Sequence, residues 1–197
     1  MREEALLRLF EETHALKRGH FQLSSGLHSG VYFQSALVLQ HPDRAEVLGR
    51  ALAKSIEPWG AEVVVGPALG GLIIAWEVAR SLDARGIFTE RHDGVMTLRR
   101  GFTLREGERT VVVEDVVTTG KSTRETIAVL ENAGGTVVGV GTIVDRSGGS
   151  VSFGVPFAAL LSLPVETFAP ADCPECAAGE ALVKPGSRPG EGVITAG

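Results

Sequence analysis

Apolar residues recur along this chain with two different spacings, which together predict alternating helices and strands. Leu6, Leu7 and Phe10 fall three or four residues apart, as on one face of an amphipathic helix. Short β-branched runs such as residues 110–113 have no polar alternation, as strands buried on both faces require. The pattern predicts helices over residues 3–17, 43–56 and 72–82 and from Lys121 onward, and strands over residues 62–65, 87–90, 110–113, 136–144 and 157–163.

Strands that alternate with helices at this spacing imply right-handed crossovers and an α/β fold, with a mostly parallel central sheet flanked by helices. Gly19 is expected to end the first helix, and residues 20–34 to form a loop leading into a strand. Residues 91–107 are charged and punctuated by glycine, which predicts a hairpin or a mobile loop. Residues 185–197 are rich in Gly, Pro and Ser, so we expect them to be poorly ordered.

Ligands of parallel sheets bind beyond the carboxyl ends of the strands. Four polar or glycine-rich loops leave predicted strand ends, at residues 66–71, 91–101, 114–123 and 145–149. We therefore expect these loops to converge on one site.

Composition narrows the class of protein. A chain of 197 residues suits one domain with a small appended subdomain. The net charge of −5 argues against a nucleic-acid or anionic-membrane partner. No apolar run approaches the roughly 20 residues that span a bilayer, and residues 1–18 are charged throughout, without an apolar signal core. A cytoplasmic location is expected.

Cys173 and Cys176 form a lone Cys-x-x-Cys. The pair supplies two of the four ligands that a structural zinc needs, and no histidine follows it. A site completed across a dimer and a redox role both remain open. The favoured interpretation is a turn near a helix start.

The segment 111–123 carries the clearest chemistry. A buried strand leads to the adjacent carboxylates Glu114 and Asp115, then to a polar loop and a helix start at Lys121. Free N–H groups at a helix start favour a phosphate, and the hydroxyls of residues 118–123 add hydrogen bonds. The carboxylates would repel that phosphate, so they need a sugar diol or a cation in the same ligand. This order predicts a ribose 5-phosphate ligand.

A nucleoside-triphosphate loop is the nearest rival, because Gly120-Lys121-Ser122 matches the end of that motif. The motif requires a glycine five positions before Gly120, and that position is Asp115. The rival fails at this residue. The remaining alternative is a pair of solvated carboxylates followed by an ordinary turn.

With these residues assembled, the chain resembles the type I phosphoribosyltransferases, and within them the orotate phosphoribosyltransferases, from about residue 10 to residue 188. Residues 111–123 are similar to the phosphoribosyl pyrophosphate motif of the family. Residues 21–34, Gly66-Pro67-Ala68 and Asp145-Arg146 carry the resemblance to the orotate branch. The resemblance implies a single domain over residues 1–188, with a hood formed mainly by residues 1–35 and the C-terminal segment, and a disordered tail over 189–197.

The resemblance also implies roles for individual residues. Glu114 and Asp115 would hold the ribose hydroxyls and act in catalysis together with Arg91, the expected pyrophosphate contact. Arg146 would pair with the orotate carboxylate, which a planar guanidinium matches bidentately. The implied phosphoribosyl pyrophosphate site comprises Glu114, Asp115, Val116, Val117, Thr118, Thr119, Gly120, Lys121, Ser122 and Arg91. The implied orotate site comprises Thr118, Arg146, Phe33 and Gln34.

The chain departs from the family pattern in places. The mobile catalytic loop of the family is rich in lysine and has a histidine, whereas residues 90–101 contain no lysine. Arg91 fits a pyrophosphate contact, but His92, Arg99 and Arg100 have no residue-by-residue match. Ser24 stands where a lysine is often found, and Leu69-Gly70 replaces a polar pair in the pyrophosphate loop. Ala68-Leu69 aligns with a peptide bond that the family can hold in the cis form.

The activity implied by the resemblance is magnesium-dependent transfer of ribose 5-phosphate to N1 of orotate, in pyrimidine biosynthesis. Mg²⁺ would arrive with the substrate, with Asp115 as a candidate ligand, and the 91–101 segment would reach the neighbouring subunit of a homodimer. Two alternatives remain. One is a phosphoribosyltransferase for a purine or uracil, against which Arg146 argues. The other is a phosphoribosyl-pyrophosphate-sensing regulator that binds nucleic acid, against which the acidic charge argues.

Overall fold

The computed structural model describes residues 1–23, 25–185 and 193–194, and a six-stranded sheet organises most of them. The strand order is β5-β4-β3-β6-β7-β8. All neighbours in this sheet are parallel except β4 and β5, which form an antiparallel hairpin. The strands are β3 (Val63–Pro67), β4 (Arg85–His92), β5 (Val95–Leu98), β6 (Arg109–Val117), β7 (Thr136–Asp145) and β8 (Phe157–Ser162). The predicted mostly parallel α/β sheet is confirmed.

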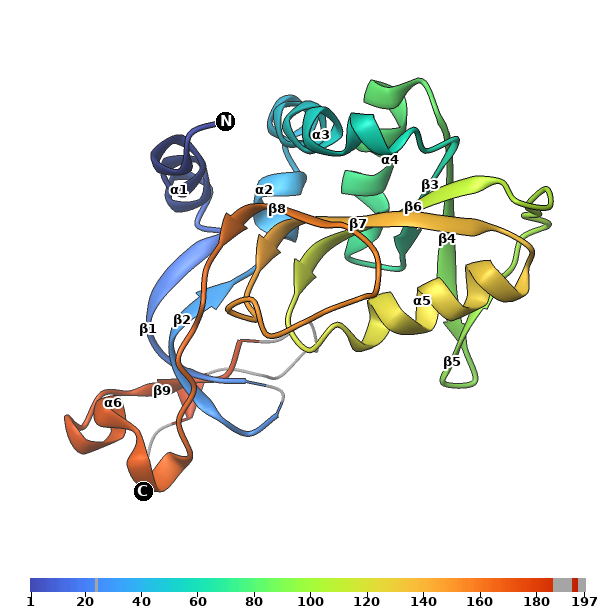
Figure 1. Ribbon diagram of the computed structural model, residues 1–197. Coiled ribbons are helices and arrows are strands. Elements are labelled where there is room, and N and C mark those ends of the chain that lie inside the picture. The colour runs from blue at the N-terminus through green and yellow to red at the C-terminus, as the bar shows by residue number, and fades with distance from the viewer. Residues whose placement is uncertain (24, 186–192, 195–197) are drawn as a thin grey trace.

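Helices cover both faces of this sheet. Helices α3 (Pro42–Ile56) and α4 (Gly71–Leu82) lie on one face, and α5 (Lys121–Asn132) lies on the other (Figure 1). Each face has its own hydrophobic cluster, because β6 alternates the direction of its side chains: Val111 and Val113 belong to one cluster and Val112 to the other. The short helix α2 (Ala36–Leu39) precedes α3, and α1 (Glu3–Glu12) packs onto the α3 side.

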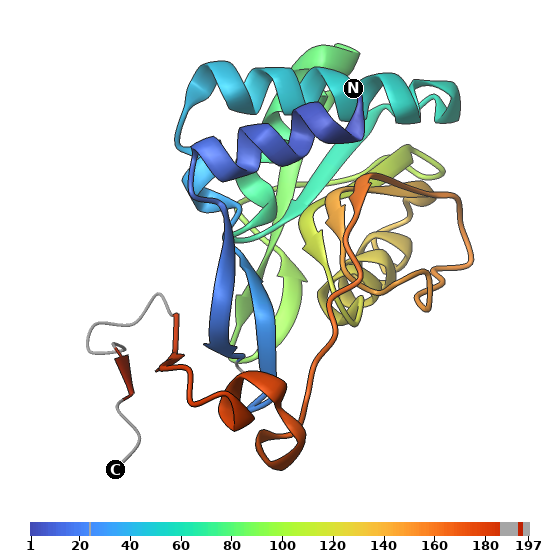
Figure 2. The same ribbon diagram turned by 90° about the vertical axis from the view of Figure 1, so that its left-hand side faces the viewer.

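A smaller sheet joins the two ends of the chain. Its order is β10-β9-β1-β2, built from β1 (Leu16–Gln22), β2 (His28–Phe33), β9 (Leu182–Val183) and β10 (Val193–Ile194). Two short 3-10 turns, η1 (Glu57–Trp59) and η2 (Pro170–Asp172), and the helix α6 (Pro174–Ala177) complete the described elements. Strands β1 and β2 are antiparallel, Phe21 pairs with Val183, and His28 forms a bridge with Phe168. The N-terminal hairpin and the C-terminal segment therefore lie side by side, away from the larger sheet (Figure 2).

Two predicted boundaries were wrong. The first helix ends at Glu12 rather than Lys17, and Leu16 begins β1. The Thr13 hydroxyl bonds back to the Leu9 carbonyl oxygen and His14 adopts a φ of 55°, which stops the helix. Gly19 consequently lies within a strand. Strand β6 continues four residues past Val113, because β7 pairs with it as far as Val117↔Asp145. The hairpin expected within residues 91–107 is confirmed by β4 and β5.

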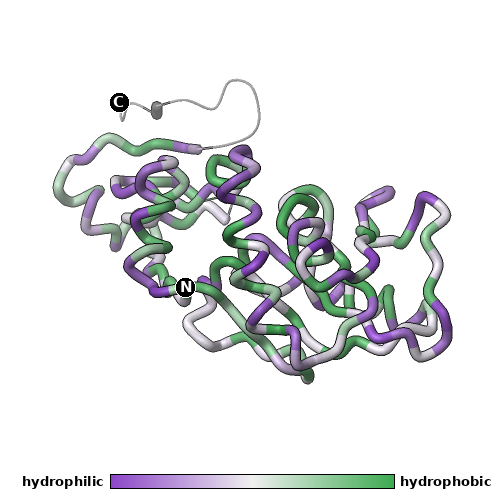
Figure 3. Tube along the Cα trace, turned by 90° about the horizontal axis from the view of Figure 1, so that it is seen from above, coloured by the Kyte–Doolittle hydropathy of each residue, from purple (hydrophilic) through white to green (hydrophobic). Residues whose placement is uncertain are grey.

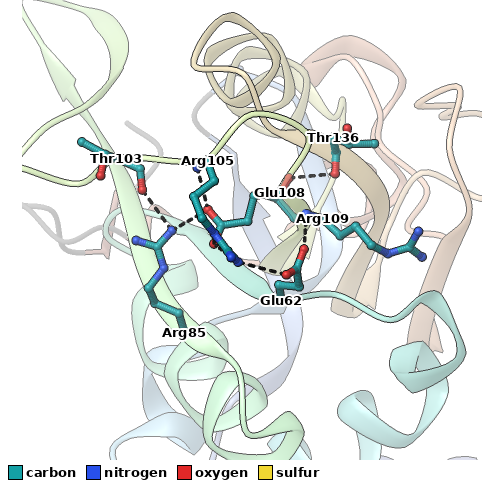
Figure 4. A network of polar contacts seen from close by, with 8 residues as sticks. Glu62, Arg85, Thr103, Arg105, Glu108, Arg109 and Thr136 are labelled. Atoms are coloured by element: carbon teal, nitrogen blue, oxygen red, sulfur yellow. Dashed lines mark hydrogen bonds and ion pairs between the residues drawn. The ribbon is translucent and has the colours of Figure 1, made fainter.

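An ion-pair network lies at the amino-terminal edge of the parallel strands, where β4 and β6 begin (Figure 4). Glu108 is buried and accepts hydrogen bonds from Arg85 Nη2 at 2.8 Å and Arg105 Nη2 at 3.0 Å, while Glu62 accepts from the Arg109 backbone at 3.0 Å. Burial alone would raise the pKa of Glu108, but hydrogen bonds from Arg105 and the charge of Arg85 outweigh it and lower that pKa. These residues pair with one another at the amino-terminal edge of the sheet. The polar loops expected to bind a ligand leave the opposite, carboxyl-terminal edge.

Most of the tail expected to be disordered, residues 189–197, lies outside the described residues; Val193 and Ile194 pair with β9. Hydrophobic and hydrophilic segments alternate along the trace (Figure 3), and none of the helices in the described part of the chain has the length and apolar character needed to cross a membrane.

Candidate functional site

The acidic pair lies on the last half of β6, at the carboxyl edge of the sheet. Glu114 is buried and Asp115 is half-buried. The Ser35 hydroxyl donates a hydrogen bond to the Asp115 carboxylate, whose other oxygen accepts the Val116 N–H at 2.9 Å. Sequence reasoning missed Ser35, because the bond joins residues 80 positions apart.

Burial changes the chemistry of Glu114. Desolvation, with a smaller contribution from the charge of Asp115, raises the pKa of Glu114 from its usual 4.5 to about 8. The free chain therefore carries a protonated Glu114 beside an acidic neighbour at neutral pH. A positive charge that enters this site would favour the ionised pair.

The loop after β3 abuts the acidic pair. A Cβ atom at Gly70 would lie 2.7 Å from both carboxylate oxygens of Asp115, and one at Gly71 would lie 2.9 Å from the Val113 carbonyl oxygen. Only glycine fits so close an approach. The Ala68–Leu69 peptide bond in this loop is cis.

A small cavity of about 70 Å³ lies at the start of α5. Gly120 precedes the helix with a φ of 70°, a conformation that favours glycine. The first N–H groups of this helix of 12 residues have no partner within the helix, so the cavity suits an anion. Its lining comprises Glu114, Val116, Val117, Thr118, Thr119, Gly120, Lys121, Ser122 and Thr123. The structure thus brings together the residues of the predicted phosphate loop.

A second cavity, of about 690 Å³, lies between the sheet edge and the smaller sheet. It shares Thr118 and Thr119 with the small cavity, so the two are adjacent. Its lining also includes Arg146, Ser147 and Ser150 after β7, Gln22, Leu23, Ser25, Leu27 and Tyr32 from the N-terminal hairpin, and Val165, Thr167 and Pro185 from the C-terminal segment.

Among the described residues that line the larger cavity, Arg146 is the charged one. Its backbone N–H donates to the Val117 carbonyl oxygen at 2.8 Å, which fixes it beside the phosphate loop. The Nε atom is buried and has no hydrogen-bond partner among the described residues. Burial lowers the pKa of Arg146, and the nearby Tyr32 offsets part of this effect. A partly desolvated guanidinium with an unsatisfied donor suits an anionic ligand.

Two residues expected near the base do not line the larger cavity. Phe33 is buried in the core, with its ring 4.9 Å from that of Phe10, and neither Phe33 nor Gln34 lines the larger cavity. Tyr32 lines it instead, because neighbouring residues of a strand point to opposite faces. The role assigned to Phe33 and Gln34 stays a prediction.

The hairpin of β4 and β5 lines neither of these two cavities. Arg91 pairs with Glu125 on α5 and donates to the Gly94 carbonyl oxygen at 2.8 Å. Arg100 binds Glu90 at 2.8 Å, and Arg99 lies 3.9 Å from the same carboxylate. Three of the four loops expected to converge therefore do so, and the hairpin does not reach them within its own chain.

The two cysteines lie at the start of α6, in the turn that the sequence favoured. No histidine follows the pair in sequence, but His20 and His28, which precede it by more than 140 residues, contact its thiols.

Comparisons with known proteins agree with this geometry. A family model described as "Phosphoribosyl transferase domain" matches residues 35–152. The orotate phosphoribosyltransferase of Pelotomaculum thermopropionicum is 54% identical over 188 residues, which cover 95% of this chain and 99% of that protein. The orotate phosphoribosyltransferase of Thermotoga petrophila is 52% identical, over 91% and 96% of the two chains.

Solved structures are similar as well. Orotate phosphoribosyltransferase from Aeropyrum pernix superposes with a TM-score of 0.68 at 29% identity, over 80% of this chain and 93% of that one. The enzyme from Mycobacterium tuberculosis in complex with phosphoribosyl diphosphate gives a TM-score of 0.62 at 26% identity, over 80% and 96% of the two chains.

Proposed function

Because this chain belongs to the phosphoribosyl transferase family, we propose that it transfers ribose 5-phosphate from phosphoribosyl pyrophosphate to N1 of orotate. The products are orotidine 5′-monophosphate and pyrophosphate, in pyrimidine biosynthesis. The observation that carries the choice of base is Arg146, which lines the cavity beside the phosphate loop and whose buried Nε has no hydrogen-bond partner in the described part of the chain. Orotate has a carboxylate to offer it, whereas uracil and adenine do not.

In this proposal each of the two adjacent cavities binds a different part of the substrates. The 5-phosphate binds in the small cavity at the start of α5, and the ribose hydroxyls bind the Glu114 and Asp115 carboxyls. Orotate occupies the larger cavity with its carboxylate on Arg146, and Thr118, which lines both, lies between phosphate and base. The smaller sheet with the C-terminal segment forms a hood over the base.

Mg²⁺ fits the residues at this edge. Asp115 offers a carboxylate oxygen, the ligand type that Mg²⁺ prefers, and Glu114 ionises when a cation approaches. Mg²⁺ commonly binds through one or two carboxylates and substrate phosphates, so Asp115 is the candidate protein ligand. When bound there, the ion would supply positive charge to neutralise the departing pyrophosphate.

Catalysis follows from electrostatics and positioning. Positive charge builds on the anomeric carbon as pyrophosphate leaves, and the Glu114–Asp115 pair stabilises it. Ser35 keeps Asp115 oriented through its hydrogen bond. The acceptor nitrogen of orotate is anionic once deprotonated, so no strong general base is needed, and the gain comes from holding the reactants in line. The hood excludes water that would hydrolyse the activated sugar.

The hairpin at residues 91–101 is proposed to act as a lid in a homodimer. Arg91 does not reach the cavities of its own chain, which supports a role at the site of a neighbouring subunit. Helix α4 and the loop before it expose Leu69, Ile73 and Trp76, an apolar surface suited to a second copy of the chain. We assign the enzyme to the cytoplasm.

A spectrophotometric assay tests the function. Purified protein with orotate, phosphoribosyl pyrophosphate and Mg²⁺ should consume orotate and release pyrophosphate, and omission of Mg²⁺ should stop the reaction. Uracil and adenine in place of orotate should be inactive. Turnover of either base would assign the chain to a sister activity, and binding of phosphoribosyl pyrophosphate without turnover of any base would favour a regulator.

A further inference from the structure

Two histidines and two cysteines of the hood meet at one point. His20 lies on β1, His28 begins β2, and Cys173 and Cys176 flank the start of α6. One donor atom from each residue lies within 4.8 Å of all the others. Figures 1 and 2 both place α6 beside the β1–β2 hairpin. Sequence separation hides this cluster, since His20 and Cys173 are 153 residues apart.

The spacing of the donor atoms matches a tetrahedral metal site. His20 Nε2 lies 3.5 Å from the Sγ atoms of both Cys173 and Cys176, and His28 Nδ1 lies 3.3 Å from Cys176 Sγ. The two ring nitrogens are 2.9 Å apart. Zinc bonds of about 2.3 Å to sulfur and about 2.0–2.1 Å to nitrogen imply sulfur–nitrogen separations of about 3.6 Å and nitrogen–nitrogen separations of about 3.4 Å. These four separations lie within about 0.5 Å of the tetrahedral values, and all four donor atoms lie within 4.8 Å of one another.

The hydrogen bond on the far side of the His20 ring prepares it as a ligand. Nδ1 lies 2.9 Å from the Glu180 carbonyl oxygen. A carbonyl oxygen can only accept, so Nδ1 carries a hydrogen, which leaves Nε2 as the nitrogen available to bind a metal in the cluster. A carbonyl partner of this kind is the usual support of a metal-binding histidine, because it fixes both tautomer and ring orientation.

The cluster lies in buried surroundings. His20, His28 and Cys173 are 3%, 4% and 2% exposed, so a bound cation would be held away from bulk water. The Cys173 thiol donates to the Glu175 carboxylate at 3.1 Å, and metal binding would displace that proton. Two sulfurs and two imidazole nitrogens in this arrangement select Zn²⁺ over hard cations such as Mg²⁺.

We propose that His20, His28, Cys173 and Cys176 bind one Zn²⁺ ion as a structural site. Four protein ligands leave no open position for a substrate, so the role of the ion is structural and not catalytic. It ties the N-terminal hairpin to the C-terminal segment, and these two segments supply the hood walls of the larger cavity, including Leu27 and Thr167. Zinc would thereby keep that cavity in shape.

Metal analysis of the untagged wild-type protein tests the site directly. After expression with zinc and dialysis against metal-free buffer, elemental analysis should find one zinc per chain, and X-ray absorption should find two sulfur and two nitrogen ligands. His28→Asn and Cys176→Ser should each lower bound zinc at least tenfold. His41→Asn, the same change at an exposed histidine of the α3 start, should retain one zinc per chain.

Cobalt substitution gives a readout that does not depend on the variants folding. Wild-type protein refolded with Co²⁺ should show the visible absorption of tetrahedral cobalt and a thiolate charge-transfer band. Wild-type protein that binds neither metal, a Cys173–Cys176 disulfide in the purified protein, or stoichiometric zinc in both variants would overturn the proposal. These readouts need no orotate or phosphoribosyl pyrophosphate, so their failure is distinguishable from failure of the proposed function.

Discussion

Replacement of Glu114 by Gln should remove a pH dependence of stability that the wild-type chain possesses. The pKa of Glu114 is about 8 in the folded chain against a usual 4.5. Between these values the folded state holds a proton that the unfolded state has lost, so stability falls as pH rises through this window. A glutamine has no such proton.

The magnitude follows from the two pKa values. Each unit of difference is worth about 1.4 kcal/mol, so a rise from pH 5 to pH 8 removes on the order of 3 kcal/mol of unfolding free energy through this one group. The figure is a ceiling, because a buried carboxylate recruits water and rearranges when it ionises.

Urea unfolding at pH 5 and pH 8, without substrate and at one protein concentration, measures the effect. The stability lost by the wild type between these pH values, minus that lost by Glu114→Gln, should be about 2–3 kcal/mol. Other titrating groups cancel in this difference. The matched control is Glu131→Gln, which removes an exposed carboxyl from the end of α5. A difference below about 0.5 kcal/mol for Glu114→Gln would refute the reasoning, because it would mean that burial does not hold the proton on Glu114.

Four further outcomes are expected. Arg146→Ala should raise the KM for orotate strongly in steady-state kinetics, with a loss of orotate binding free energy on the order of 2–5 kcal/mol, because the orotate carboxylate loses its buried partner. The KM for phosphoribosyl pyrophosphate should rise only slightly, and equal losses for both substrates would contradict the assignment. Asp115→Asn should keep the melting temperature and lower kcat at least tenfold, and normal turnover would remove Asp115 from the mechanism. Gly120→Ala should abolish binding of phosphoribosyl pyrophosphate in calorimetric titration, since its Cβ would lie 2.8 Å from the Phe153 ring in a backbone with φ of 70°; unchanged affinity would reject the phosphate cavity. Arg91→Ala and Asp115→Asn, each of low activity alone, should partly complement when their subunits are mixed, because a heterodimer would hold one intact site; no regained activity after confirmed exchange would place Arg91 in its own chain.

The sequence alone predicted what contiguous segments carry. The strand, acidic pair, phosphate loop and helix of residues 111–123 follow one another directly, so their geometry is local, and the structure has them in that order. The family expectation is confirmed by the matching family model. The mostly parallel sheet is also confirmed, because alternating β-branched runs and amphipathic stretches decide which elements form. The first helix was overextended because Leu16 fits both a helical spacing and a buried strand position.

Tertiary packing decided the features that depend on distant residues. Burial raises the pKa of Glu114, and Ser35 reaches Asp115 across 80 positions. Tyr32 lies on the face of β2 that lines the larger cavity, and Phe33 lies on the other face and packs in the core. The same packing brings His20 and His28 to the two cysteines near the other end of the chain. Local pattern specifies which elements form and which residues follow a strand end, but the dielectric around a carboxyl and the partners of a thiol are set by chain segments that meet only after folding.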